Sequence, residues 1–129
     1  MNLYLDIDGT IITKQGGKEA EHLLEFLNFA IENFDCYWLT SHCKGNANTA
    51  LEYIEDKVSK ESFDLLKKFK PTTFGLWKTE AIDFVEDFIW LDDYAFDGER
   101  AMLEKNGALD KLILIDLKNK PEQLLDLIK

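Results

Sequence analysis

Short apolar runs alternate along this chain with segments of helical periodicity, and this alternation restricts the fold more than any other feature. Each run is apolar on both faces and rich in aromatic or branched side chains, which is typical of strands buried on both sides. The runs are LYLDI at 3–7, CYWL at 36–39, FIWL at 88–91 and LILID at 112–116. A weaker candidate, TTFGL at 72–76, is expected to form a fifth strand.

The segments between these runs carry apolar residues at helical spacing, most clearly over 23–34 and 47–58. Further helices are expected over about 61–69, directly after Lys78, from about 98 to 106, and from Pro121 onward. Strand–helix alternation indicates a parallel sheet with helices on both faces. We therefore predict an α/β fold: a single Rossmann-like domain over residues 1–129 with a central, mostly parallel five-stranded sheet.

The composition restricts the partners and the compartment. A formal net charge of −10 disfavours binding to free nucleic acid or to anionic membrane surfaces. Cys36 and Cys43 are too few for a disulfide scaffold and lack zinc-type spacing, so reduced thiols in the cytoplasm are expected. No apolar run approaches the roughly 20 residues that span a bilayer, and no signal-peptide pattern opens the chain. We therefore expect a cytoplasmic protein with no membrane partner.

Acidic, hydroxyl and basic residues cluster near the ends of the predicted strands. They are Asp6 and Asp8 at the end of the first run, Thr40 and Ser41 after the second, Lys78 at the start of the helix that precedes the run at 88–91, and Asp92 and Asp93 directly after that run. Ligands of open parallel sheets bind beyond the carboxyl ends of the strands. We therefore expect these side chains to converge on one edge of the sheet.

Such a set of residues suits phosphoryl transfer. Carboxylates from two strands can hold Mg²⁺, which prefers a few carboxylates together with water and a substrate phosphate. One aspartate of the first pair could attack phosphorus, while the other protonates the leaving oxygen and later deprotonates water. Thr40 could hydrogen-bond a phosphoryl oxygen, and Lys78 could offset the negative charge. The sequence therefore predicts an aspartyl-phosphate intermediate and Mg²⁺ as the cofactor.

The segments DIDGT, WLTSH, WKTEA and WLDDYAFD, in this order, resemble the four motifs of the haloacid dehalogenase superfamily of phosphatases. The resemblance extends over residues 6–97 and implies a hydrolase that acts on phosphoric monoesters. It also implies that Asp6 is the nucleophile and a metal ligand, and that Asp8 is the general acid/base and contributes its backbone carbonyl to the metal. An aspartate at the position of Asp8 is typical of the phosphatases and phosphomutases of the family rather than its dehalogenases.

The resemblance assigns the remaining roles as well. The implied phosphate-binding residues are Gly9, Thr40, Ser41 and Lys78, and the implied metal ligands are Asp6, Asp8, Asp92 and Asp93. Asp97 is an alternative ligand in the same motif. We assign no catalytic role to His42 or Cys43, for which packing or hydrogen bonding is the simpler interpretation, and Arg100 is most simply a surface residue of its helix.

No segment is long enough for the cap domain that family members often carry. Residues 9–18 leave room only for a small flap with a turn at Gly16 and Gly17, and residues 40–78 are taken up by the expected helices and weak strand. An uncapped site favours a bulky phosphorylated substrate, such as a phosphorylated polypeptide or a nucleic-acid end presented by another protein. No motif identifies this substrate or the oligomeric state.

Two other classes of function use similar residues. A phospho-accepting receiver domain also combines aspartates, Mg²⁺, a hydroxyl and a lysine, but its adjacent acids follow the first strand, whereas here they come last. A phosphate-binding or interaction module of the same fold without turnover is the second alternative. A phosphotransferase that uses an acceptor other than water is a closer variant of the phosphatase hypothesis.

Overall fold

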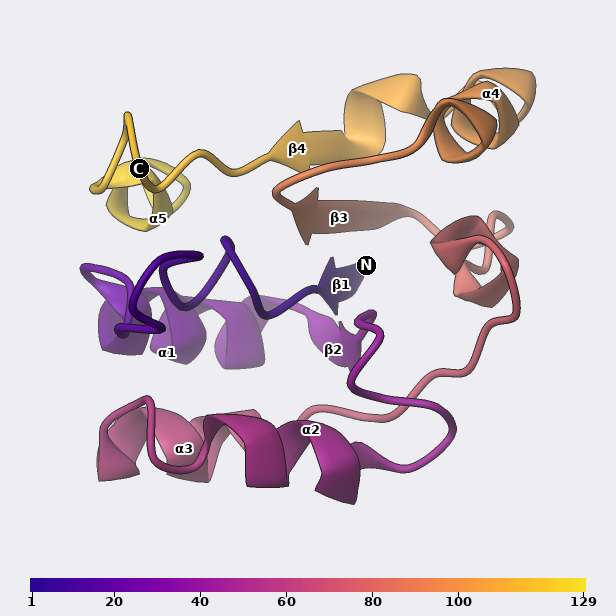
Figure 1. Cartoon of the computed structure of the whole chain (residues 1–129). Helices are drawn as coiled ribbons and strands as arrows, with labels where there is room; N and C mark the ends of the chain where they lie inside the picture. Colours follow the sequence, from indigo (N-terminus) through magenta and orange to yellow (C-terminus); the bar gives the residue numbers. More distant parts are fainter.

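The computed structural model describes residues 1–129 and contains a four-stranded, entirely parallel sheet (Figure 1). The strands are β1 (Asn2–Leu5), β2 (Asp35–Trp38), β3 (Phe88–Asp92) and β4 (Leu112–Leu114), in the spatial order β2-β1-β3-β4. β1 is paired on both sides, with Leu5 opposite Trp38 of β2 and Leu91 of β3. The α/β class and the four main strands are therefore confirmed, and β1 lies between two neighbours.

The predicted fifth strand at 72–76 is wrong, because this segment has no regular structure. The chain makes one parallel bridge to β2 at Lys70, whose carbonyl accepts a hydrogen bond from the N–H of Trp38 at 2.8 Å. The next bond of a parallel ladder would run from the N–H of Thr72 to the carbonyl of Trp38, because alternate residues face the partner strand. Thr72 instead donates its hydroxyl to the carbonyl of Trp38. The β-branched and aromatic residues of TTFGL indicated a strand, but the hydroxyl of Thr72 takes the carbonyl of β2 that its N–H would need for further pairing.

Helices pack on both faces of the sheet. They are α1 (Leu23–Asn33), α2 (Ala47–Ile54), α3 (Lys60–Leu66), α4 (Asp97–Lys105) and α5 (Gln123–Asp126), with two short 3₁₀ helices, η1 (Lys78–Ala81) and η2 (Leu109–Lys111). Figure 1 shows α1, α2 and α3 in one part of the molecule and α4 apart from them. None of these helices is both long and apolar enough to cross a membrane.

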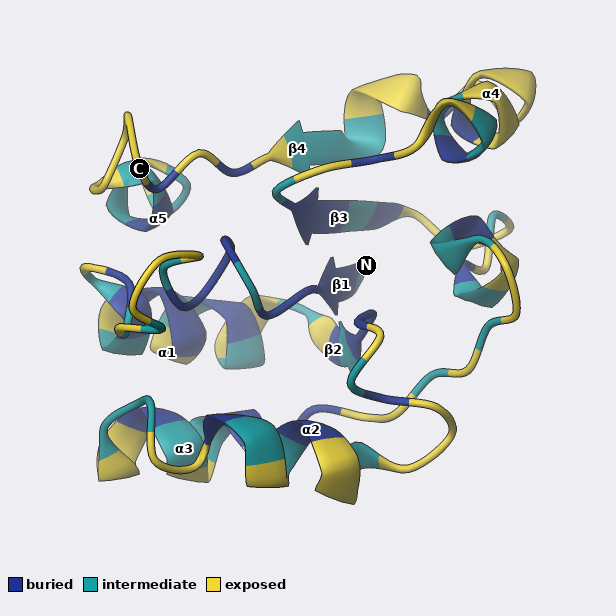
Figure 2. Cartoon of the chain, viewed as in Figure 1, coloured by how far each residue is buried: buried dark blue, intermediate teal, exposed yellow.

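Two hydrophobic cores lie on opposite faces, because successive side chains of a strand point in opposite directions. Leu3 and Leu5 belong to the larger core, together with buried residues of α1, α2, α3 and α5. Tyr4 belongs to the smaller core, with Trp90 of β3 and Leu103 of α4. Figure 2 shows the central strands β1 and β3 as mostly buried. Both faces of the sheet are therefore covered. A ligand-binding site is expected at the edge formed by the carboxyl ends of the strands.

A flap follows β1 in place of a cap domain. Ile12 pairs with Glu19 in an isolated antiparallel bridge, and the N–H of Thr13 donates to the carbonyl of Lys18 at 2.7 Å. The turn between them contains Gly16 and Gly17 with φ of 89° and 56°, conformations that favour glycine. The expected turn at these glycines is therefore present, and the flap begins close to the carboxyl edge of the sheet.

Candidate functional site

Three aspartates from the two central strands meet at the carboxyl edge of the sheet. Leu5 of β1 lies opposite Leu91 of β3, and the N–H of Asp6 donates to the carbonyl of Leu91 at 3.1 Å. This register places Asp6 beside Asp92 and Asp93, and one carboxylate oxygen of each lies within 4.8 Å of the others. Asp6 and Asp92 are buried and Asp93 is half-buried. Three clustered carboxylate oxygens are donors that suit a hard cation such as Mg²⁺.

Lys78 supplies the positive charge next to these acids. Its Nζ lies 2.6 Å from Oδ2 of Asp92 and 3.4 Å from Oδ1 of Asp6. The indole N–H of Trp90 donates to the same oxygen of Asp92 at 3.2 Å, and the backbone N–H of Tyr94 donates to the other oxygen at 3.3 Å. The lysine therefore lies where it can neutralise both buried carboxylates, as the sequence predicted for a charge-offsetting residue.

The ionisation of this group follows from its burial. Burial lowers the pKa of Lys78, but the carboxylates of Asp6 and Asp92 outweigh this effect and raise the pKa above its ordinary value. Burial, followed by the charge of Asp6, raises the pKa of Asp92 to about 8, although Lys78 opposes the change. With one lysine beside them, the two acids together keep a proton in the metal-free state up to a pKa of about 8 for Asp92, and a bound cation would take the place of that proton.

Glu99, which sequence reasoning missed, holds the backbone of Lys78 in place. Its buried carboxylate accepts the N–H of Lys78 at 2.8 Å and the N–H of Phe96 at 2.9 Å. These two bonds join the start of η1 to the start of α4. The signal in the sequence was the glutamate three residues after Phe96, a spacing typical of helix capping.

The side chain of Asp8 is bound by two aromatic residues instead of joining the three clustered aspartates. The hydroxyl of Tyr53 donates to Oδ1 of Asp8 at 2.6 Å, and Nε2 of His42 donates to Oδ2 at 2.8 Å. The rings of His42 and Tyr53 stack, with centroids 3.8 Å apart and an interplanar angle of 13°. Burial raises the pKa of Asp8, but the hydrogen bonds from Tyr53 and His42 outweigh it and bring the pKa below its ordinary value.

The expected phosphate-binding residues differ in their placement. Thr40 is fully buried directly beyond β2, and its hydroxyl accepts the N–H of His42 at 3.3 Å. Gly9 has a φ of 77°, and a Cβ on it would lie 2.6 Å from Oδ2 of Asp93, so glycine is needed for this close approach. Ser41 is exposed and makes no side-chain hydrogen bond. The structure thus places Gly9 beside the acids and leaves Ser41 in solvent.

Lys14 is a second cation at the site that the sequence did not indicate. It lies in the flap, and its Nζ is 2.9 Å from Oδ2 of Asp93. Its side chain is 71% exposed, which makes this ion pair far weaker than the buried pair formed by Lys78. The sequence offered one hint of this position, namely that Lys14 follows closely after the DIDGT segment.

Three further residues, in or near the sequence motifs, lie outside the group of acids. Asp97 is the exposed first residue of α4 and does not join the clustered aspartates. Arg100 donates from Nε to the carbonyl of Ala95 at 3.3 Å, and the buried thiol of Cys43 donates to the carbonyl of Thr72 at 3.5 Å. These contacts fit the structural roles expected of Arg100 and Cys43.

A cleft of about 620 Å³ borders the group of acids. It is lined by Gly9 and Asp93, by residues 13–15 of the flap and by residues 114–118 at the end of β4. Its volume falls within the range of small-molecule sites. The candidate site is therefore open on the side of β4.

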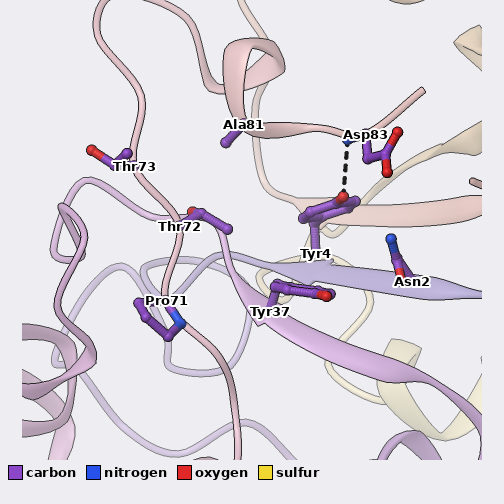
Figure 3. A pocket seen from close by; sticks show the side chains of 8 residues that line it. All are labelled: Asn2, Tyr4, Tyr37, Pro71, Thr72, Thr73, Ala81 and Asp83. Carbon is purple, nitrogen blue, oxygen red and sulfur yellow. Dashed lines mark hydrogen bonds between the residues drawn. The ribbon is translucent and has the colours of Figure 1, made fainter. Parts of the chain in front are cut away.

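A second hollow of about 310 Å³ lies away from the acids (Figure 3). Figure 3 shows Tyr4 and Tyr37 on neighbouring strands, with the hydroxyl of Tyr4 accepting the N–H of Asp83 at 3.1 Å. The two tyrosine rings stack with centroids 5.5 Å apart. None of the predicted site residues lines this hollow, so it is separate from the candidate site.

No protein-family model matches the chain, and no curated protein and no solved structure matches it. The residues at the carboxyl edge are therefore the basis on which a function can be assigned.

Proposed function

We propose that the chain is a Mg²⁺-dependent phosphomonoester hydrolase of the haloacid dehalogenase type, with Asp6 as the nucleophile and Asp8 as the general acid/base. One observation carries this proposal: Asp6, Asp92 and Asp93 lie together at the carboxyl edge with Lys78 against two of them. The order of these residues along the chain and their resemblance to the four family motifs support the same assignment.

The donor set fits Mg²⁺. Carboxylate oxygens of Asp6, Asp92 and Asp93 would hold the ion, and the resemblance adds the backbone carbonyl of Asp8. Bound Mg²⁺ would orient the phosphoryl group and offset its negative charge. The raised pKa of Asp92 is the physical reason to expect a cation at this position, because a cation would replace the proton that the two acids beside Lys78 otherwise keep.

The residues of the chain account for both half-reactions. In the first, an Oδ of Asp6 forms a bond to phosphorus while the bond between phosphorus and the ester oxygen breaks, and Asp8 gives its proton to that oxygen. In the second, water attacks phosphorus, Asp8 takes the proton of the water, and the bond to Asp6 breaks. Lys78 offsets charge on the phosphoryl oxygens, and the hydroxyl of Thr40 donates to one of them.

We propose a phosphorylated substrate that reaches the site without displacing a cap. The small flap and the adjoining cleft support this part of the proposal. We also propose a reducing compartment such as the cytoplasm, because both cysteines are free and buried.

The test is phosphate release from p-nitrophenyl phosphate with Mg²⁺ and with EDTA. Asp6→Asn keeps the shape of the side chain and removes the nucleophile, so we expect a loss of about 1,000-fold or more. Asp64→Asn is the matched control, because Asp64 is an exposed residue of α3 remote from the site, and it should keep wild-type activity.

Equal turnover by wild type and Asp6→Asn would refute the proposed nucleophile. A folded wild type that binds Mg²⁺ but releases no phosphate from aryl or alkyl esters would instead favour the phosphate-binding module.

A further inference from the structure

The cleft beside the group of acids is lined by one lysine from each of two separate segments. Lys14 comes from the flap, and Lys118 comes from the segment that follows β4. Figure 1 shows the flap after β1 and the segment after β4 at the same end of the sheet. We propose that this cleft receives the alcohol part of the substrate, and that Lys14 and Lys118 bind a second anionic group on it. This inference rests on the proposed function and narrows the substrate to small organic phosphates that carry a further carboxylate or phosphate.

The cleft adjoins the place where the phosphoryl group would be held. Gly9 and Asp93 line it, and Asp93 is one of the three clustered aspartates. A substrate whose phosphoryl group lies at these acids can therefore extend its alcohol part into the adjoining space. The volume of about 620 Å³ suits a small molecule, and Leu114, Ile115 and Leu117 line the cleft with apolar surface for its carbon atoms.

The flap holds the backbone of Lys14 in a defined position. The hydroxyl of Thr13 accepts the N–H of Lys18 at 3.0 Å, in addition to the backbone bond that joins the same two residues. Oε1 of Glu19 accepts the N–H of Ser59 at 2.7 Å, which ties the flap to the residue before α3. Lys14 therefore projects from an anchored turn rather than from a free loop.

The segment that carries Lys118 is also built by specific hydrogen bonds. Both carboxylate oxygens of Asp116 accept from Asn119, one from its N–H at 3.2 Å and the other from its side-chain amide at 2.8 Å. The side chain of Gln123 accepts the N–H of Asp116 at 2.7 Å and donates to the carbonyl of Leu114 at 2.8 Å. The acid of this segment is thus engaged in its own turn, whereas Lys118 is exposed and forms no ion pair.

The charges of the cleft favour an anionic ligand group. The chain has 25 acidic and 15 basic residues, so most of its surface repels anions, and two lysines that line one cleft depart from this pattern. The ion pair of Lys14 with Asp93 does not prevent this role, because its side chain is 71% exposed and such a pair is weak. A neutral alcohol gains nothing from the two ammonium groups, whereas a carboxylate or phosphate on the alcohol is attracted by both.

The experiment measures kcat and KM at saturating Mg²⁺ for two matched pairs of esters: glycerol 3-phosphate with 3-phosphoglycerate, and fructose 6-phosphate with fructose 1,6-bisphosphate. The second member adds a carboxylate in the first pair and a phosphate in the second, so the pair that responds identifies the anion. We expect Lys14→Met and Lys118→Met each to lower the ratio of kcat/KM, second member to first, by about 5-fold in that pair, and the double variant to lower it further. The loss should lie in KM, because the lysines bind a group remote from the reacting atoms.

The ratio within a pair removes any effect common to both esters, such as one caused by the loss of the contact between Lys14 and Asp93. Lys105→Met is the matched control, because it removes the same charge from the exposed last residue of α4, outside the cleft, and should keep the wild-type ratios.

Ratios that the double variant changes by less than about 2-fold in both pairs would overturn this inference alone. A wild type that hydrolyses p-nitrophenyl phosphate but none of these esters would also overturn it alone. A wild type that hydrolyses neither p-nitrophenyl phosphate nor any of these esters would overturn it together with the proposed function.

Discussion

Replacing Lys78 with methionine should destabilise the metal-free protein strongly, because it leaves two buried carboxylates without their cation. Nζ of Lys78 lies 2.6 Å from Asp92 and 3.4 Å from Asp6, and the side chains of these acids are only 2% and 11% exposed. Breaking a buried ion pair by removing one partner costs about 3–5 kcal/mol. For a chain of this size the loss corresponds to a fall in Tm of about 10–20 °C.

The pH and Mg²⁺ dependence of this loss make the prediction specific. Asp92 keeps its proton below a pKa of about 8 even beside Lys78, so its charge adds to the loss only above that pH, and the loss should be larger at pH 9 than at pH 6. Saturating Mg²⁺ should recover much of the stability, because a cation held by the folded state replaces the charge of Lys78. Urea unfolding in EDTA and in Mg²⁺ at the two pH values measures each effect.

Lys14→Met is the control, since it removes a lysine from the same group of acids at an exposed position. The side chain of Lys14 is 71% exposed, so its loss should cost at most about 1 kcal/mol. A cost below about 1 kcal/mol for Lys78→Met in EDTA at pH 9, or a cost equal to that of Lys14→Met, would refute the electrostatic reasoning.

Two further predictions concern the same edge of the sheet. The pKa of Asp92 is raised from 3.8 to about 8 on folding, so the folded metal-free state keeps a proton that the unfolded chain has lost, and this residue should lower stability as pH rises between those values. Urea midpoints of wild type and Asp92→Asn across this range should show that slope only in the wild type, and an identical slope in both would contradict the assignment. Gly9→Ala should weaken Mg²⁺ binding measured by calorimetry, because its Cβ would displace Asp93. Gly107→Ala, at a φ of 66° with no atom within 4 Å of the added Cβ, carries only the backbone cost and should bind Mg²⁺ normally; equal affinities would refute the steric argument.

The parts of the fold that follow from periodicity were predictable from the sequence. Buried parallel strands are apolar on both faces, so all four runs could be recognised before their pairing was known. The segment at 72–76 was misread because its composition suits a strand, while its pairing with β2 ends where the hydroxyl of Thr72, and not its N–H, binds the carbonyl of Trp38. The last helix was expected from Pro121 but begins at Gln123, a difference typical of helix boundaries.

The candidate site was predictable only in part. Asp6, Asp92 and Asp93 could be placed together because each lies at or directly after the end of a strand, and neighbouring parallel strands end at one edge. Tyr53 and Glu99 could not be placed, because they lie on helices whose approach to the edge depends on loop conformation and packing. Their positions along α2 and α4 give no periodic signal of contact with the site.

The central position of β1 also has a consequence for how the chain folds. β2 follows β1 after one helix, whereas β3 comes from much farther along the chain. Contacts between distant segments form later, because closing a long loop costs entropy before any contact compensates for it. Asp6 therefore meets Asp92 and Asp93 only when β3 docks. On this argument the repulsion among these carboxylates arises only once β3 joins β1, a step that β4 must still follow.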